Sequence, residues 1–499
     1  MYIKNKLRNY LGILSVGILM VSCNKLEDFG DLNVNPNGAT TVNTGALLTN
    51  VLANLGGTTS SLVPGLYCQY YAESTYPGTS LYADPNFSSA ALYSGILYDC
   101  QKIINYNSDP ATAAIAAANG NNNNQIQIAR ILKVYLFSNL TDKYGDIPYS
   151  QALGGVTVLS PKYDDQESIY KSFLSELTDA STLLDLAGAP QKGDIAFSAD
   201  IAKWKKLANS LRMLYSLRLS ERYPGAAEYA AVEFNKAVTA AGGYISSNAD
   251  NLQLTYPGGN LRNPYFALGQ TLDNAVSSTF TNILTGLSDT RVNVFTTSST
   301  GCPYGLASAA NPNPSRIFVA TLRAENAAFY FVTASQVLLA LAEGMERGWV
   351  AGATTANAQI AYNAGITASF AQWGLAVPAG YLTSGTVDYS TGSGVASIGN
   401  AITVPGSSAA TPTKLDRIAL QQFIAYYPEG IQGWNNWRRT DMPKLKPTIN
   451  ATNSSKQIIR RYTYAPYEYN LNGAQLAIQI AKMGAAGNSQ DTHVWWDKN

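Results

Sequence analysis

The feature that most constrains the fold is one helix that is apolar on almost every face. It begins near Gln125, within the stretch 125–153. A surface helix keeps a polar face, whereas apolar residues here cover too many faces for that arrangement. The sequence therefore predicts a helix buried among other helices, ended by Gly145, which tolerates positive φ, and Pro148, which lacks an amide donor. Its apolar residues are Ile126, Ile128, Ile131, Leu132, Val134, Leu136, Phe137 and Leu140.

Amphipathic helices recur after this central helix. The 499 residues are 46% hydrophobic and can bury a large core, and no linker divides them. Helices separated by short breaks are typical of tetratricopeptide pairs, although no clean repeat is present. We therefore expect one mainly all-α domain over 23–499, with its helical body mainly at 125–245 and 325–375. The further helices expected are 166–186, 199–221, 226–241, 332–345 and 356–370.

Three long segments interrupt the helical pattern. The stretch 67–90 is rich in tyrosine, and 252–323 and 377–413 are rich in Gly, Asn, Pro, Ser and Thr. Segments of this length are too long for ordinary connections between helices. We expect them to be irregular excursions that form the ligand-facing half of the protein.

The first 22 residues indicate an export signal. A basic start precedes an apolar run from Leu11 to Val21. This run is about half of the roughly 20 apolar residues that span a bilayer, so 1–22 is predicted to be a signal peptide. Ser22 stands directly before Cys23 in an order like a bacterial lipobox, which predicts lipidation of Cys23. The alternative is an ordinary signal peptide cut near a chance cysteine.

Charge and histidine content argue against several classes of function. The formal net charge is +1, and nucleic-acid binding depends on neutralising many phosphates. The chain has 32 tyrosines but one histidine, His493, whereas triads, most zinc sites and many acid/base schemes use histidine. We therefore expect a binding protein with no catalytic residue, no metal, no cofactor and no nucleic-acid partner.

Three cysteines remain beyond Cys23, namely Cys68, Cys100 and Cys302. Export to an oxidising space permits a disulfide, but three is an odd number and the sequence does not choose the pair. The pair that we favour is Cys68 with Cys100.

Two of the irregular segments carry tyrosines beside glycine and proline, where an exposed ring can meet a ligand. Tyr76 and Tyr82 lie on the first segment. A second group adds amides and a guanidinium that can donate to hydroxyl groups. The alternative is that these tyrosines pack the loops onto the helical body, because buried tyrosine is common. The second group is Tyr256, Asn260, Arg262, Asn263 and Tyr265.

Tryptophan and arginine gather near the C-terminal end. Trp437 and Arg438 form one cluster, and Trp495 and Trp496 form another. Such clusters can bind a sugar or an anion, but large aromatic side chains mostly serve packing. The interpretation that we favour is a C-terminal cap on the helical body.

These motifs together resemble the SusD/RagB family of Bacteroidetes outer-membrane lipoproteins, in particular its SusD-like subgroup. The resemblance covers essentially the whole chain, and the order and spacing of the motifs carry it. The motifs are the lipobox at Cys23, the turn 33–37, the run Leu140 to Tyr149, the helix Trp204 to Arg218, Asp289 with Arg291, Ala342 to Gly348, Tyr362 to Phe370, Trp437 to Arg439, Arg461 to Asn472, and Trp495 to Asp497.

The resemblance implies a tetratricopeptide-like body with an irregular ligand-binding half and no catalysis. Family members cap the extracellular mouth of a SusC-like TonB-dependent barrel and hold oligosaccharides, or in the RagB branch peptides, for import. The chain is thus expected at the cell surface, held in the outer membrane by its lipid, as a capture protein for a glycan. An aromatic ring suits this work because it buries the apolar face of a sugar while polar neighbours bond the hydroxyls.

Three other functions stay open. Peptide capture would use the same architecture. A glycoside hydrolase needs two carboxylates about 5 to 10 Å apart, and with 33 acidic residues such a pair is not excluded, although no acid cluster stands out. The third is a structural scaffold built on helical repeats. The sequence does not name the ligand.

Overall fold

Helices account for about 51% of the chain in the computed structural model, and its strands are few and short. This confirms the predicted all-α class. The chain divides into two units, Met1–Asn43 and Thr44–Asn499, and the fold described here is that of the second. The predicted signal peptide, Cys23 and the turn 33–37 lie outside the described residues. The structure describes residues 41–84, 86–271, 273–306, 315–392 and 412–498.

The helices follow one another along the second unit and the strands are interspersed. The helices are α2 (Thr44–Thr59), α3 (Val63–Tyr67), α4 (Ala90–Leu92), α5 (Tyr98–Ser108), α6 (Ala113–Ala116), α7 (Asn122–Tyr144), α8 (Gln166–Leu183), α9 (Ile201–Arg218), α10 (Tyr229–Val238), α11 (Pro264–Leu268), α12 (Ser278–Gly286), α13 (Val292–Phe295), α14 (Ala334–Glu346), α15 (Thr355–Gln372), α16 (Lys414–Tyr426), α17 (Gly430–Thr440), α18 (Pro466–Leu471) and α19 (Gly473–Lys482). The strands are β1 (Tyr71–Glu73), β2 (Ile147–Pro148), β3 (Tyr163–Asp164), β4 (Leu252–Thr255), β5 (Asn274–Val276) and β6 (Ala328–Val332). A π-helical turn, η3 (Tyr93–Leu97), joins α4 to α5, and short 3₁₀ turns are η4 (Ala117–Asn119), η5 (Gly155–Thr157), η6 (Asn248–Asp250), η7 (Tyr381–Thr383) and η9 (Gly484–Ala486).

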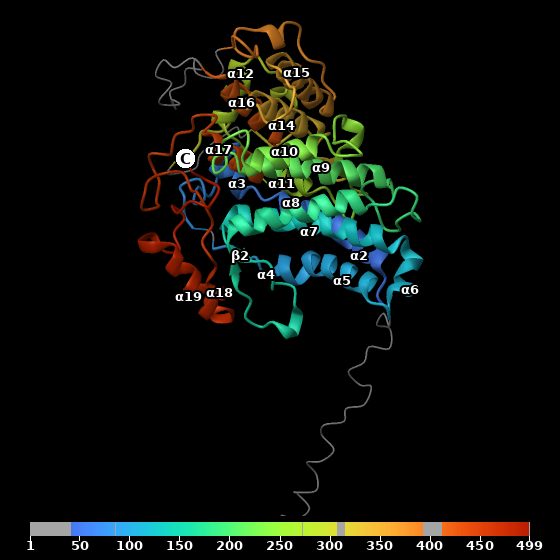
Figure 1. Cartoon of the computed structure of the whole chain (residues 1–499). Helices are drawn as coiled ribbons and strands as arrows, with labels where there is room; N and C mark the ends of the chain where they lie inside the picture. The colour runs from blue at the N-terminus through green and yellow to red at the C-terminus, as the bar shows by residue number, and fades with distance from the viewer. Residues whose placement is uncertain (1–40, 85, 272, 307–314, 393–411, 499) are drawn as a thin grey trace, which may run out of the picture. The chain divides into compact units, whose positions relative to one another are not determined.

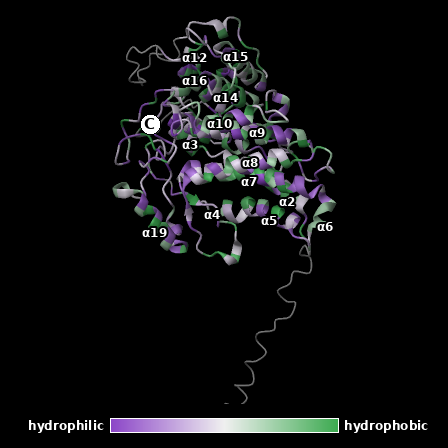
Figure 2. Ribbon diagram, in the orientation of Figure 1, coloured by the Kyte–Doolittle hydropathy of each residue, from purple (hydrophilic) through white to green (hydrophobic). Residues whose placement is uncertain are grey.

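The predicted central helix is α7, which is buried on all sides. Polar residues such as Gln125 and Asn139 are buried along it together with the apolar ones, and Figure 2 shows hydrophilic and hydrophobic residues intermixed on it. The side chain of Asn121 begins the helix by accepting from the Asn124 N–H at 3.0 Å. Gly145 ends it at φ 81°, and its N–H donates to Thr141 O at 2.8 Å. The helix end therefore forms as the sequence predicts.

Helices that are neighbours in sequence lie side by side on either flank of α7. On one flank α8, α9 and α10 follow in turn, and α14 packs on α9 and pairs with α15 and α16. On the other flank α5 packs on α7 and α2 packs on α5 (Figure 1). The pairs α9 with α10 and α14 with α15 match the predicted tetratricopeptide-like arrangement. None of the helices in the described ranges is both long and apolar enough to cross a membrane.

The strands form three two-stranded antiparallel sheets that tie the irregular segments together. β1 pairs with β5, β2 with β3, and β4 with β6. The Ser277 N–H extends the first contact by donating to Tyr70 O at 2.9 Å. Stretches 67–90 and 252–323 are therefore joined, and both contain short helices and strands rather than loops alone.

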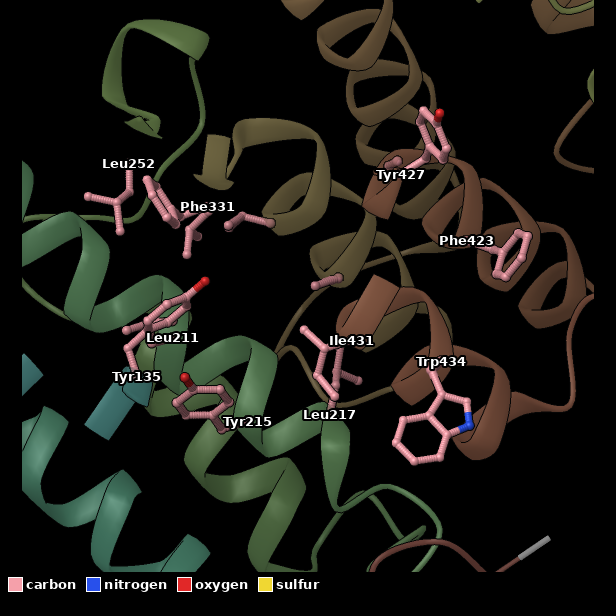
Figure 3. Packing of buried hydrophobic residues seen from close by; sticks show 14 of the residues in the cluster. Tyr135, Leu211, Tyr215, Leu217, Leu252, Phe331, Phe423, Tyr427, Ile431 and Trp434 are labelled. Carbon is pink, nitrogen blue, oxygen red and sulfur yellow. The ribbon is translucent and has the colours of Figure 1, made fainter. Parts of the chain in front are cut away.

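Aromatic and aliphatic side chains from distant helices form one core. Figure 3 shows Tyr135 of α7 near Leu211 and Tyr215 of α9, with Ile431 and Trp434 of α17 on the opposite side. Trp434 and Trp496 are fully buried. The predicted C-terminal cap is confirmed, because α17 packs against α3, α16 and α7.

Buried polar groups join this cap to the helical body. Arg439 of α17 donates to both carboxylate oxygens of Glu343 on α14, with the Nη2 to Oε2 distance 2.7 Å. Gln422 of α16 donates to the same carboxylate at 2.9 Å. The guanidinium charge lowers the pKa of Glu343 to about 2 against the effect of burial. Such bidentate pairs are stronger than neutral hydrogen bonds.

The favoured disulfide is not formed. Cys68 and Cys100 are both buried free thiols. Cys68 packs near α17, with its Sγ 3.9 Å from Gly430 O, whereas Cys100 lies on α5. Each thiol is held inside a separate helix contact, so the pairing expected from the sequence is wrong.

Candidate functional site

A cavity of about 590 Å³ opens beside the C-terminal end of α7. Its size is within the range of small-molecule sites, roughly 300 to 1,000 Å³. It is lined by residues from α2 and the loop after it, from α4 and the loop before it, and from η3, α7 and the segment after α17. They are Asn50, Asn54, Gly57, Thr58, Ser61, Phe87, Ser88, Ser89, Ala91, Leu92, Gly95, Ile96, Leu140, Lys143, Tyr144 and Tyr462.

Three aromatic rings form one wall of the cavity. The Phe87 ring lies 6.0 Å from that of Tyr462 between centroids, and Tyr144 lies 5.6 Å from Tyr462. The Tyr144 hydroxyl donates to Phe87 O at 2.8 Å and so fixes the loop that carries this ring. Phe87 is 43% exposed, whereas Tyr144 and Tyr462 are buried. The wall therefore presents one accessible ring supported by two that are held in the core.

Amide and hydroxyl groups stand at the mouth of the same cavity. Asn50 and Asn54 are exposed on α2, where the Asn54 amide donates to the Asn50 side chain at 2.9 Å. Asn50 in turn donates to Asp99 at 2.8 Å. Ser89 shares a hydrogen bond with the Tyr467 hydroxyl at 3.0 Å. These side chains still have donors and acceptors to offer a ligand with many hydroxyl groups.

Lys143 contributes the charge in this cavity. It is the last residue but one of α7, half-buried, and burial lowers the pKa of its ammonium to about 8. Burial raises the pKa of the Tyr144 and Tyr462 hydroxyls, so both are neutral at physiological pH. None of the lining residues within the described ranges carries a carboxyl group, so these residues do not form the carboxylate pair that glycoside hydrolysis needs.

The first pair of predicted binding residues divides between surface and core. Tyr76 is 73% exposed, as expected. Tyr82 is 1% exposed, and its hydroxyl accepts from the Thr448 N–H at 3.3 Å. The expectation of an exposed ring is therefore wrong for Tyr82, because this ring holds the loop onto the segment after α17.

The second predicted group divides in the same way. Tyr265 is 4% exposed and stacks on Phe329 at 4.9 Å. Tyr256 is 4% exposed and packs on α2, where a Cβ added to Gly56 would lie 2.2 Å from its hydroxyl. Both rings were predicted to be exposed, and both are buried instead, because each fills a gap between elements.

The polar members of that group have structural partners. Asn263 is buried and caps α11 by accepting from the Tyr265 N–H at 2.9 Å. Arg262 is exposed and pairs with Glu325 at 3.2 Å. Asn260 is exposed. In the ranges that the structure covers, no hydrogen bond or ring contact joins Tyr76 to these residues, and none of the predicted residues lines the cavity beside α7.

The residues of this cavity were missed for a clear reason. Phe87 lies in the tyrosine-rich stretch and satisfies the same criterion as Tyr76, an aromatic residue among loop-forming neighbours, here Asn86 and Ser88. A search for tyrosine alone passes over it. Asn50 and Lys143 lie on helices and carry no local signal, because only the packing of α2 and α7 brings them to one cavity.

Comparison with known families decides the assignment. Residues 36–465 match the family of SusD-like proteins described as starch-binding and associating with the outer membrane. The chain belongs to the SusD-like family. Proteins of this family bind carbohydrate and are not catalytic, so this SusD-like protein is not an enzyme. It is a glycan-binding protein of nutrient capture, from a family associated with the outer membrane.

Solved structures similar to this SusD-like protein share its fold over more than nine-tenths of its length. A chitin-binding protein is 27% identical, with a TM-score of 0.72 over 92% of this chain and 100% of its own. A chitin-binding SusD homologue from Flavobacterium johnsoniae is 24% identical, with a TM-score of 0.74 over 91% and 98%. A SusD homologue from Bacteroides uniformis is 23% identical, with a TM-score of 0.73 over 91% and 99%. No curated protein matches the sequence.

Proposed function

We propose that this SusD-like protein is a lipid-anchored surface protein that binds a glycan in the cavity beside α7 and passes it to a SusC-like TonB-dependent transporter. The observation that carries the proposal is the accessible Phe87 ring facing a cavity whose mouth bears the amides of Asn50 and Asn54. A sugar has an apolar face and a rim of hydroxyls, and this arrangement offers a surface for each.

The construction of the wall supports binding rather than packing. The Tyr144 hydroxyl fixes the loop that carries Phe87, and the buried Tyr462 ring packs against the Phe87 ring. A ring held in place loses little conformational freedom when a ligand stacks on it. The cavity is thus organised before the ligand arrives.

Membrane attachment is proposed from the sequence. The order of residues up to Cys23 resembles a lipobox, and the family is associated with the outer membrane. A lipid at that position would hold the helical unit at the membrane surface, where a transporter can receive the glycan.

Calorimetric titration against glycans and peptides tests the binding step. Chito-oligosaccharides belong in the panel because similar structures are of chitin-binding proteins. We expect at least one glycan to bind, and we expect Asn54→Ala to weaken its affinity. Asn248→Ala, which removes an amide far from the cavity, is the control. Binding of peptides alone, or glycan affinity that Asn54→Ala leaves unchanged, would contradict the proposal.

Purification from native membranes in mild detergent tests the partner. We expect a large TonB-dependent barrel to purify together with the SusD-like protein. Recovery of the protein alone under several detergents would contradict the transporter step and leave the glycan site standing.

A further inference from the structure

The charge of the cavity beside α7 is unbalanced. Among the described residues that line it, Lys143 alone has a charged side chain, and the others are amides, hydroxyls, glycines, aliphatic residues and aromatic rings. A cavity that is part of the core would exclude such a charge, since an ammonium loses hydration energy on burial. The side chain is nevertheless held half-buried at this position.

Asp142 is the first acidic group that acts on Lys143, and its carboxylate has other partners. The Asp142 carboxylate accepts from Tyr170 at 2.5 Å, from Trp496 at 2.9 Å and from Asn435 at 2.7 Å. It also lies 3.4 Å from the guanidinium of Arg218. Three hydrogen bonds and one ion pair therefore hold this carboxylate to groups on the core side of α7.

Glu429 is the other acidic group that acts on Lys143. It accepts from the Tyr135 hydroxyl at 3.1 Å, and burial raises the pKa of its carboxyl to about 8. It therefore carries only part of a charge at neutral pH. Across the part of the chain that the structure describes, no hydrogen bond or ion pair reaches the Lys143 ammonium.

We propose that the ligand is an acidic saccharide and that the Lys143 ammonium binds its carboxylate. This inference rests on the proposed function and specifies the class of glycan. The same cavity supplies the Phe87 ring for the apolar face of the sugar and the Asn54 amide for its hydroxyls. A uronic acid joins all three chemical features, a ring face, hydroxyl groups and a carboxylate, within one residue.

The energetic argument is that a ligand anion supplies what the protein lacks. Burial already disfavours the ammonium, as its lowered pKa shows. A carboxylate that enters the cavity stabilises the charged form and gains a charge-assisted hydrogen bond. A neutral sugar would instead leave the ammonium partly dehydrated and unpaired. The cavity therefore discriminates in favour of the acid.

The test uses matched acidic and neutral probes. Oligomers of galacturonate, glucuronate and mannuronate are titrated calorimetrically at pH 7, each beside its methyl ester, which keeps the sugar and removes the charge. Variants are Lys143→Met, which keeps the volume of the side chain, and Phe87→Ala, which marks binding in this cavity. We expect at least one acid to bind about tenfold tighter than its ester, as one ion pair shielded from water allows.

The outcomes separate this inference from the proposed function. The inference is supported if the acid binds tighter than its ester, if Lys143→Met abolishes this preference, and if Phe87→Ala weakens the binding of both acid and ester. Equal affinity for acid and ester overturns the inference, and so does a preference for the acid that survives Lys143→Met. In either case, weaker binding by Phe87→Ala would still support a glycan site in this cavity. Failure of all three acids to bind overturns it, and the chito-oligosaccharide titration then decides whether the glycan site itself stands.

Discussion

The carboxylate of Asp142 accepts a hydrogen bond from the Trp496 indole at 2.9 Å, which joins the end of the central helix to the C-terminal end of the described chain. Trp496 is fully buried, and the guanidinium of Arg438 lies 4.6 Å from its ring. Arg438 also donates to Asp142 O at 2.6 Å. The C-terminal segment is thus part of the core of this SusD-like protein and closes it over α7.

Removing the Asp142 carboxylate is expected to destabilise the whole helical unit. Asp142→Ala leaves Arg218 buried without its ion-pair partner and the Trp496 indole without its acceptor, which costs about 3 to 5 kcal/mol for a buried charged partner. Urea denaturation followed by circular dichroism measures this loss. The control is Asp179→Ala at an exposed ion pair with Arg130, which should cost at most about 1 kcal/mol. Equal losses in the two variants would contradict the assigned role.

The Glu343 pair with Arg439 predicts a loss of stability in acid. The folded pKa of Glu343 is lowered from 4.5 to about 2, so its contribution is present above pH 4.5 and is lost as pH falls toward 2. The amount is on the order of 3 kcal/mol. Denaturation at several pH values between 2 and 6 measures the slope. Glu343→Gln should flatten it, whereas Glu325→Gln at an exposed pair should leave it unchanged.

Phe87 and Tyr76 provide a direct test of where glycan binds. Phe87→Ala should weaken glycan affinity by about 1 to 3 kcal/mol, the range of other stacking contacts, with little change in melting temperature because the ring is 43% exposed. Tyr76→Ala is the matched control at an exposed aromatic outside the cavity. If Tyr76→Ala weakens binding and Phe87→Ala does not, the cavity beside α7 is the wrong site.

Lys143 predicts opposite effects of pH on binding and on stability. Its folded pKa is about 8, so the charge that binds an acidic saccharide is lost as pH rises through 8, and affinity should fall. Asp142 and Glu429 are the acids that raise this pKa, and the neighbouring Tyr144 and Tyr462 hydroxyls stay neutral. Titration of an oligouronate between pH 6 and 9 measures the effect. An affinity that stays constant over that range would contradict it.

Lys143 should lower the free energy of unfolding when no ligand is bound. A lysine whose pKa falls from 10.5 to about 8 on folding binds fewer protons in the folded state between those values, so stability rises with pH there. At pH 7 the charge is destabilising, and Lys143→Met should raise the free energy of unfolding by ~1 kcal/mol after allowance for partial exposure. Lys482→Met at an exposed pair is the control. A lower melting temperature for Lys143→Met would show that the ammonium is stabilised by the protein itself.

Cys23 is expected to carry the lipid. Cys23→Ala should move the protein from the membrane fraction to the soluble fraction and abolish labelling with a fatty acid. Cys68→Ala is the control at a buried thiol. A Cys23→Ala variant that is still labelled and still sediments with membranes would place the anchor elsewhere.

The regular part of the fold could be predicted because each helix carries its own signal. The end of α7 could be predicted because Gly145 adopts a positive φ, which glycine tolerates and most other residues do not. The helix α17 was not predicted, although Ile431, Trp434 and Trp437 recur at a spacing of three, because Asn435 and Arg438 beside them are buried through polar partners from distant segments. A long-range hydrogen bond leaves no periodicity that a local pattern can report.

The site could be predicted only as a region. The stretch 67–90 does border the cavity, through Phe87 to Ser89. Tyr82 and Tyr265 were expected at the surface because they lie beside glycine and proline, but a loop residue is exposed only where no second segment covers it. The segment after α17 covers Tyr82, and Phe329 of β6 covers Tyr265. Coverage of this kind depends on tertiary contacts and not on neighbours in sequence.

Asp142 and Lys143 are adjacent in sequence and face different sides of the same helical turn. Successive residues on a helix point about 100° apart, so the carboxylate serves the core while the ammonium serves the cavity. Mutations at 142 and at 143 are therefore under different constraints. Position 142 cannot change without opening the C-terminal closure, whereas position 143 can exchange its positive side chain for a neutral one at little structural cost. A lineage that carries this scaffold could thus change the charge of the nutrient that it captures by one substitution.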